Sequence, residues 1–354
     1  MPLWTWLLPV LALAAFGAAA AIGMAPWLAV VCGAALAGAV FAAVHHAEVV
    51  AHRVGEPFGT LVLALAVTAI ETALILSMML AGGDDMATLP RDAIYAAVML
   101  ISTGVVGLCV WVGGLAHREQ TFRVEGAGAG LAALMVMATL TLVLPAFTIT
   151  SPGPTYSVSQ RAFVAVASAA LWAIFVFSQT VRHRDYFIPA SEDGDEHHAA
   201  PPTNAQAWAS FGLLLLALVT VVGLAKKLSP TIESAVAAAD APRAVVGIII
   251  AALVLLPETW AAVRAARANR LQSSMNLAIG SALACVGLTV PVVVTASILF
   301  NLPLVLGVAP KDMVLLAITF LVSAVTLTTG RTYVMQGAVH LVLFASYLFL
   351  AFVP

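Results

Sequence analysis

Apolar runs of about twenty residues recur along the chain and are separated by short polar breaks. A helix of this length crosses the hydrocarbon core of a bilayer and satisfies its own backbone hydrogen bonds there. The pattern predicts about eleven membrane-spanning helices, at residues 3–23, 27–50, 57–81, 92–114, 126–147, 161–181, 207–225, 244–263, 274–299, 312–329 and 333–353. We therefore expect an all-α polytopic membrane protein.

The composition of the chain agrees with a membrane location. Of the 354 residues, 62% are hydrophobic and 9% are charged, more apolar surface than a water-soluble chain of this length can bury. We therefore expect membrane lipid around the helices. The net charge of −2 leaves no basic face for nucleic acid, so no such partner is expected. The three cysteines lie inside apolar runs, without the spacing of a disulfide framework or a zinc site.

The first apolar run, residues 3–23, is long enough to span and lacks the basic segment that opens a signal peptide. We expect this helix to be retained. With the N-terminus in the cytoplasm, nine arginines fall in cytoplasmic loops and six arginines and lysines in outer loops. An odd number of spans then places the C-terminus on the periplasmic or extracellular side. High alanine and only three lysines are typical of a GC-rich bacterial source, which indicates the inner membrane.

A polar, proline-bearing segment at residues 182–206 interrupts the apolar pattern near the middle of the chain. We predict a cytoplasmic linker there, between a first five-helix repeat at 26–181 and a second at 207–354, after an N-terminal helix at 1–25. The acidic run SEDGDEHH within it, residues 191–198, either gathers cations and regulates, or is a solvated loop. Repeats with an odd number of spans have opposite orientations, the pattern of inverted-repeat transporters.

Isolated glutamates occupy matching positions in the two halves. Glu71 and Glu258 are each the fifteenth residue of an apolar run, and each is followed by threonine. Outer acids precede them, Glu48 by 23 residues and Glu233 by 25 residues. A shorter match joins the motifs VVGL at 105–108 and CVGL at 285–288. The matched depth of Glu71 and Glu258 is the strongest of these signals and predicts a site near the middle of the membrane.

A charged side chain at the bilayer centre costs about 2.5–3.5 kcal/mol on insertion scales, so two of them need a reason. Each glutamate is either a protonated or hydrogen-bonded structural acid, or part of a transport site. Two ionised glutamates facing one cavity form a doubly negative empty site, which one divalent cation or two protons neutralise. Since only the neutral, loaded site reorients readily, exchange of cation for protons follows. Carboxylate, carbonyl and hydroxyl oxygens suit Ca²⁺.

Hydroxyl and carbonyl groups near these glutamates extend the predicted metal site. Thr68 lies about one turn before Glu71, and Ser281 lies in the apolar run MNLAIGSALA. Each of these hydroxyls either supplies a ligand or bonds to its own helix. Pro257, directly before Glu258, can break its helix and free carbonyl oxygens for the site.

A second candidate site is the segment HHAEVVAH, residues 45–52. His45, Glu48 and His52 fall at i, i+3 and i+7, on one face of a helix. The spacing is compatible with a transition-metal site, or with a zinc hydrolase that takes a further ligand from elsewhere, although HExxH is absent. Near the cytoplasmic end of a helix, the same residues also suit an entry vestibule, a proton relay or a polar membrane interface.

Three stretches resemble the cation/proton exchanger branch of the calcium:cation antiporter superfamily. They are HHAEVVAHRVGEPFGTLVLALAVTAIETALI (45–75), PETWAAVRAARANRLQSSMNLAIGSALACVGLTVPVVV (257–294) and TGRTYVMQGAVHLVLFASYL (329–348). The resemblance covers nearly the whole chain. It implies two inverted repeats that each offer one cation-binding and proton-exchanging glutamate, here Glu71 and Glu258. It also implies that Glu48 and Glu233 lie near the two mouths.

The chain both keeps and loses polar positions of that family. Ser281 matches the serine of a family Gly-Ser pair. Thr68 and Leu255 stand where the wider family has asparagine, and Ala284 stands where it has glutamine. These departures leave the paired glutamates intact but leave the transported ion open between Ca²⁺, Na⁺ and K⁺.

The function that the sequence favours is a secondary antiporter that exports Ca²⁺ in exchange for H⁺. The chain has no P-loop motif, so we expect no use of ATP and no cofactor beyond the transported ions. A Na⁺(K⁺)/H⁺ antiporter on the same site is the first alternative. An intramembrane metalloenzyme built on His45, Glu48 and His52 is the second, and it leaves the Glu71/Glu258 symmetry unexplained. A homo-oligomer is compatible with the sequence, which does not decide the oligomeric state.

Overall fold

The structure, a computed structural model, describes residues 2–55, 58–82, 86–188, 202–242 and 244–353. Ten helices in this part of the chain are long and apolar enough to cross a membrane, and α3 matches the remaining predicted span. The spanning elements are α1 (Leu3–Ile22), α2 (Pro26–Val54), α3 (Phe58–Gly82), α4 to α5 (Leu89–His117), α6 (Val124–Ala138), α7 (Val158–Phe177), α8 (Asn204–Ala238), α9 (Ala244–Arg267), α10 (Leu271–Leu299), α11 (Pro310–Thr328) and α12 (Val334–Phe352). The predicted all-α polytopic fold is confirmed.

Two helices start at capping boxes in their sequences, and one long helix contains a change of helical type. Capping boxes open α7 at Ser157 and α8 at Thr203, where each hydroxyl accepts from the backbone N–H three residues on. The long helix Leu89–His117 consists of α4 and α5 joined by a π-helical segment at Leu100–Val105. The sequence pattern predicted this span but not its change of helical type.

One helix boundary predicted from the sequence is wrong. The span predicted at 207–225 belongs to α8, which continues through Pro230 to Ala238. Lys226 and Lys227 are therefore exposed residues on a helix and not part of a loop. Hydropathy ends a predicted span at the first charges, whereas α8 continues past them, and its residues Leu228 and Val236 are buried in the apolar cluster that also contains residues of α2.

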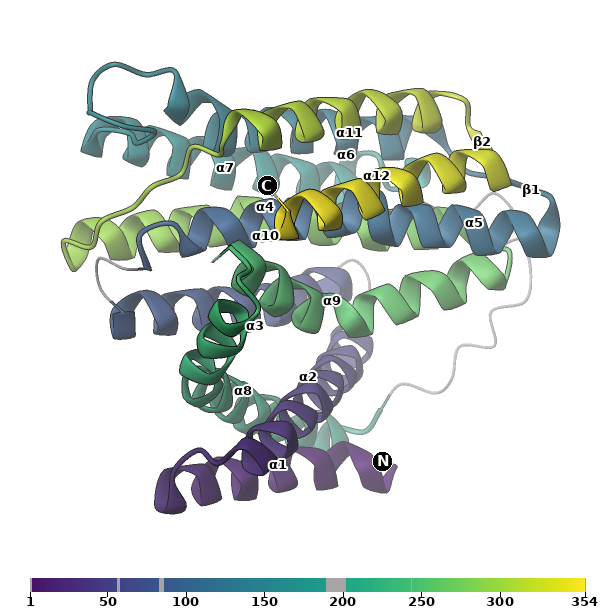
Figure 1. The fold of residues 1–354 in the computed structure, drawn as a ribbon. Coiled ribbons are helices and arrows are strands. Elements are labelled where there is room, and N and C mark those ends of the chain that lie inside the picture. Colours follow the sequence, from purple (N-terminus) through teal and green to yellow (C-terminus); the bar gives the residue numbers. More distant parts are fainter. Residues whose placement is uncertain (1, 56–57, 83–85, 189–201, 243, 354) are drawn as a thin grey trace.

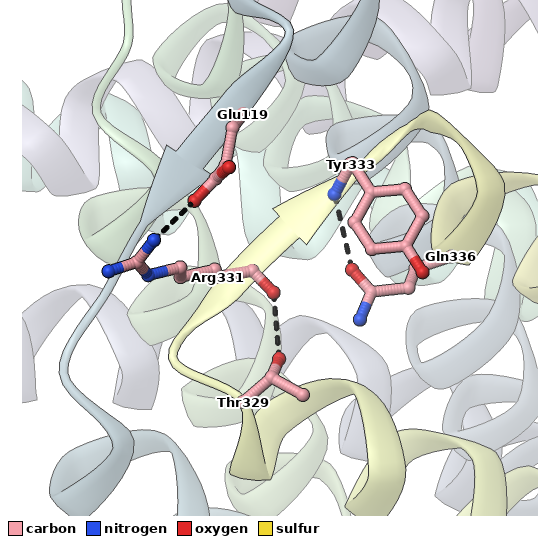
Figure 2. Close-up of polar contacts among 5 residues, drawn as sticks. All are labelled: Glu119, Thr329, Arg331, Tyr333 and Gln336. Carbon is pink, nitrogen blue, oxygen red and sulfur yellow. Dashed lines mark hydrogen bonds and ion pairs between the residues drawn. The ribbon is translucent and has the colours of Figure 1, made fainter.

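A short two-stranded ribbon was not expected from the sequence. The strands β1 (Glu119–Thr121) and β2 (Arg331–Tyr333) pair antiparallel and join the α5–α6 connection to the α11–α12 connection. The Arg331 guanidinium pairs with the Glu119 carboxylate across the ribbon at 3.2 Å. Figure 2 shows this ion pair. Strands of three residues are too short to produce an alternating pattern, so the pairing depends on the helices that bring the two connections together.

Polar contacts join the ends of neighbouring helices at both ends of the bundle. At one end, the His117 side chain bonds to the carbonyl of Arg267 at 2.8 Å, near the β1–β2 ribbon. At the other end, the Lys311 ammonium donates to the carbonyl of Leu350 at 2.7 Å. The predicted topology places the connections near His117, Arg267 and the ribbon on one side of the membrane, and Lys311 and the C-terminus on the other. The observed contacts follow the same grouping. Which end faces the cytoplasm stays a prediction.

The buried apolar residues form two separate clusters with α3 and α9 between them. One cluster joins α1, α2 and α8, and the other joins α4 to α7 and α10 to α12. On α3, Ile70 and Leu74 belong to the first cluster, whereas Ile75 and Met79 belong to the second. Figure 1 shows the same arrangement, with α1, α2 and α8 on one side of the molecule. The two glutamate-bearing helices therefore lie at the junction of the clusters.

Corresponding helices of the two halves have corresponding neighbours. By their order in each half, α3 corresponds to α9, the α4 to α5 span corresponds to α10, and α7 corresponds to α12. Helix α3 packs on α10, and its counterpart α9 packs on α4. In the same way, α7 packs on α10, and its counterpart α12 packs on α5. Glycines permit the second pair of contacts. A Cβ at Gly287 would lie 2.5 Å from Trp172 Cβ on α7, and one at Gly107 would lie 3.0 Å from His340 Cβ on α12. These glycines are the ones matched by the motifs CVGL and VVGL.

Candidate ion-binding site

The two intramembrane glutamates lie on α3 and α9, and both helices pack against α10. Glu71 is almost fully buried, with 5% of its surface exposed, and Glu258 is half-buried. Neither carboxylate has an ion-pair partner in the part of the chain that the structure describes. An ionised carboxylate inside a membrane is costly when it has no partner of opposite charge.

One face of α10 binds both carboxylates. The Ser281 hydroxyl donates to Glu258 Oε2 at 3.1 Å, and the Cys285 thiol donates to Glu71 Oε1 at 2.8 Å. Ser281 and Cys285 are four residues apart on the helix, which corresponds to a rise of about 6 Å. The two carboxylates are therefore held on neighbouring turns of a single helix, as a shared site requires.

The polar face of α10 continues for one further turn. Thr289, four residues after Cys285, shares a hydrogen bond of 2.9 Å with the hydroxyl of Thr72 on α3. The threonine that follows the other glutamate behaves differently, since Thr259 donates to the carbonyl of Leu255 in its own helix at 2.7 Å. The two Glu-Thr pairs, which match in sequence, thus differ in their contacts.

The other groups predicted to support the site have mixed outcomes. Thr68 is buried and lies one turn before Glu71 on α3. The expectation that Pro257 breaks its helix is wrong, because α9 runs without interruption from Ala244 to Arg267. Proline still lacks an N–H, so the carbonyl four residues earlier loses its helical donor inside the continuous helix. Pro257 can therefore expose an oxygen without unwinding α9.

The outer acids lie away from the paired glutamates along their helices. Glu48 is exposed near the end of α2, and Glu233 is half-buried on α8, where Ser229 donates to its Oε1 at 2.6 Å. Their positions at the ends of the two helices that pack most extensively on each other are compatible with the predicted mouths.

The alternative metal site on α2 is not formed. His45 is half-buried against the Trp4 ring, at a centroid distance of 5.1 Å, while Glu48 and His52 are exposed. In the described ranges, no group of three or more His, Cys, Asp or Glu side chains is gathered so that it could hold a metal ion. Sharing one helical face is not enough, because seven residues separate His45 from His52 and no other helix in the described part of the chain supplies a completing ligand.

The same finding constrains the glutamate site. Glu71, Glu258 and Cys285 do not converge on one point either, so a bound cation requires oxygen ligands from hydroxyls, carbonyls or water as well. Such mixed oxygen coordination is typical of hard cations.

Sequence reasoning missed three polar residues that the structure makes important. Cys285 and Thr289 follow Ser281 at i+4 and i+8, so a search for polar residues at helical spacing would have found them. His46 is fully buried and bonds to the carbonyl of Thr5 at 2.8 Å and to Ser210 Oγ at 3.2 Å. It joins α1, α2 and α8, which no local pattern reveals. The acidic run 191–198 lies outside the described residues.

Comparisons with known proteins agree with this arrangement. The family model described as "Sodium/calcium exchanger protein" matches residues 24–181 and 209–353. The putative ionic transporter y4hA of Sinorhizobium fredii is 45% identical over 361 residues, which cover 100% of this chain and 97% of that protein. The sodium-potassium/proton antiporter ChaA of Escherichia coli is 35% identical over 316 residues, 88% of this chain and 85% of that protein.

The fold also matches solved structures. The crystal structure of the H⁺/Ca²⁺ exchanger CAX superposes with a TM-score of 0.71 at 15% sequence identity. The match covers 98% of this chain and 87% of that chain. The resemblance to the cation/proton exchangers is confirmed.

Proposed function

Because the chain belongs to the sodium/calcium exchanger protein family, a family of secondary transporters, we propose that it exchanges a cation for protons at Glu71 and Glu258. The observation that carries this proposal is the attachment of both carboxylates to neighbouring turns of α10. An empty, doubly ionised site is costly in a low-dielectric interior, and cation or protons remove that cost. The site therefore reorients when loaded, which couples the two fluxes by alternating access.

Calcium is the cation that we propose first. Two carboxylates, with Ser281 and Thr68 as supporting hydroxyls, form the hard oxygen surroundings that Ca²⁺ prefers. The H⁺/Ca²⁺ exchanger CAX, named for this ion, shares the fold of the chain. We propose that export of Ca²⁺ is driven by entry of H⁺ and that no resident cofactor takes part.

Sodium and potassium form the second candidate. The relative from Escherichia coli, at 35% identity, is named a sodium-potassium/proton antiporter. In addition, Thr68, Leu255 and Ala284 stand where the wider family has side-chain amides. Fewer amide ligands alter the number and geometry of oxygen donors, so ion choice has to be measured.

Two inverted repeats, 26–181 and 207–354, form the proposed transport unit, joined by the linker 182–206 and preceded by the helix of residues 1–25. The packing between the halves supports this division. Helix α3 of the first repeat packs on α10 of the second, and its counterpart α9 of the second repeat packs on α4 of the first. We further propose that the protein lies in the bacterial inner membrane with a cytoplasmic N-terminus.

The vestibules are proposed at the ends of α2 and α8. Glu48, with His45 and His52 on the same helix, would attract cations or relay protons at the cytoplasmic mouth, and Glu233 would do so at the outer mouth. Exposed or half-buried polar groups at a mouth exchange with solvent faster than the buried Glu71.

Proton flux from inverted membrane vesicles tests the proposal. A dye that reports ΔpH is followed while Ca²⁺, Na⁺ and K⁺ are added in turn to vesicles with wild-type protein or Glu258→Gln. Loss of ΔpH on adding micromolar Ca²⁺, absent in the variant, is the expected result. A response to Na⁺ or K⁺ alone would assign the monovalent function, and no response to any cation would reject exchange at this site.

A further inference from the structure

We propose that Cys285 is the positioning residue for Glu71, and that its thiol sets the affinity of the transport site. The proposal rests on the proposed exchange at Glu71 and Glu258. The sequence placed Cys285 among apolar residues with no role, whereas the structure places its Sγ 2.8 Å from Glu71 Oε1.

The contact is enclosed on both sides. Cys285 is 1% exposed and Glu71 is 5% exposed, so water does not compete freely for either group. Another buried cysteine shows the ordinary alternative, since Cys32 contacts the backbone carbonyl of Ala15 at 3.7 Å. The thiol of Cys285 instead reaches a side chain on a different helix, at a shorter distance.

The bond from Cys285 joins the two halves of the chain. Ser281 and Glu258 both belong to the second half, on α10 and α9. Glu71 belongs to the first half, on α3, and Cys285 is the residue of α10 that holds it. The thiol therefore links the first carboxylate directly to the helix that also binds the second.

Positioning by a donor affects affinity through entropy. A glutamate side chain has several rotatable bonds, and fixing it on cation binding opposes that binding. A carboxylate already held by a donor has lost this freedom before the cation arrives, so the cation binds more tightly. Because a carboxylate oxygen has two lone pairs, the thiol can keep its bond while the cation is coordinated.

Three variants test the role. Cys285→Ala removes the donor, Cys285→Ser restores a donor of similar size, and Cys109→Ala is the matched control at a fully buried cysteine of α5. Exchange is measured in proteoliposomes at one pH, with Ca²⁺ concentration varied. We expect Cys285→Ala to raise the half-saturating Ca²⁺ concentration about tenfold with the maximal rate kept, because only ground-state ordering is lost.

The other variants decide between positioning and packing. Cys285→Ser should remain within about twofold of the wild-type half-saturating concentration, and Cys109→Ala should be unchanged. Equal affinity in Cys285→Ala and wild type overturns the proposal, and so does a serine variant as impaired as the alanine variant. Wild-type protein that exchanges no cation would overturn the proposed function itself.

An infrared measurement tests the hydrogen bond of Cys285 directly, without replacing this residue. In the double variant Cys32→Ala/Cys109→Ala, Cys285 is the single thiol of the chain. Its S–H stretching band in infrared spectra should have the frequency of a hydrogen-bonded thiol and should change on addition of Ca²⁺. A band at the frequency of a free thiol, insensitive to Ca²⁺, overturns the proposal even if Cys285→Ala fails to fold.

Discussion

The hydroxyl oxygens of Thr72 and Thr289 lie 2.9 Å apart and join α3 to α10 inside the membrane-spanning region. Both residues are buried, with 7% and 0% of their surfaces exposed. In sequence, Thr72 comes directly after Glu71 on α3, and Thr289 lies one helical turn after Cys285 on α10. This bond therefore fixes the register of α3 against the helix that binds both carboxylates.

Replacing either threonine by valine keeps the shape and removes the bond. We expect Thr72→Val and Thr289→Val each to lower the free energy of unfolding by about 1 kcal/mol, as interhelical hydrogen bonds in membranes typically do. The double variant should lose less than the sum of the single losses, with a coupling of about 0.5–1.5 kcal/mol in a thermal-unfolding cycle in detergent. Strict additivity would show that the bond contributes nothing.

Glu71 and Glu258 should each be essential for transport. Glu71→Gln and Glu258→Gln keep volume and hydrogen bonding but remove the charge that binds cation and proton, so exchange should fall by at least about a hundredfold. Thermal stability should be unchanged or higher, because an unpaired charge has been removed. Glu125→Gln, at an exposed position on α6, is the control that keeps activity. If Glu71→Gln or Glu258→Gln remains active, the glutamate replaced in that variant is not part of the site.

Protons and cation should compete at the same oxygens. The half-saturating cation concentration should therefore fall as pH rises on the cation-binding side, because fewer protons occupy the two carboxylates. The measurement is ΔpH dissipation in vesicles over a series of external pH values at varied Ca²⁺. A half-saturating concentration that does not change with pH would contradict a shared site.

The buried His46 should be a stability determinant and not a transport residue. It bonds to Thr5 and Ser210 and thereby ties α1 and α8 to α2. His46→Ala should lower the free energy of unfolding by about 2–4 kcal/mol, since it leaves a cavity and two unpaired polar groups. His45→Ala, half-buried against Trp4, should cost less than half as much in the same detergent melt. Equal losses would mean that the bonds of His46 carry little stability.

The close crossing of α7 and α10 should tolerate no side chain at Gly287. Gly287→Ala places a Cβ 2.5 Å from Trp172 Cβ, so the helices have to separate, and we expect a loss of about 1–3 kcal/mol. The matched control is Gly280→Ala on the same helix, where an added Cβ meets nothing within 4 Å. The control should be neutral or slightly stabilising, because alanine is the better helix former. Similar melting temperatures for both variants would show that α7 and α10 do not cross this closely.

The spans and the paired glutamates could be predicted from the sequence because each depends on a local cost. Backbone groups in lipid must bond within their own helix, so every apolar run of sufficient length becomes a helix. A carboxylate in such a run carries a desolvation cost that marks Glu71 and Glu258 without knowledge of their neighbours. Matched depth in two halves then indicated a common site.

The remaining features arise from contacts between distant segments. Cys285 and Thr289 gain their roles only because α3 lies against α10, and a cysteine or threonine in an apolar run looks the same wherever it points. The β1–β2 ribbon forms because helix packing brings two short connections together. Hydropathy determined which segments enter the membrane; the tertiary structure decided which of their few polar atoms meet, because hydrogen bonds between helices depend on rotation and register, which composition does not encode.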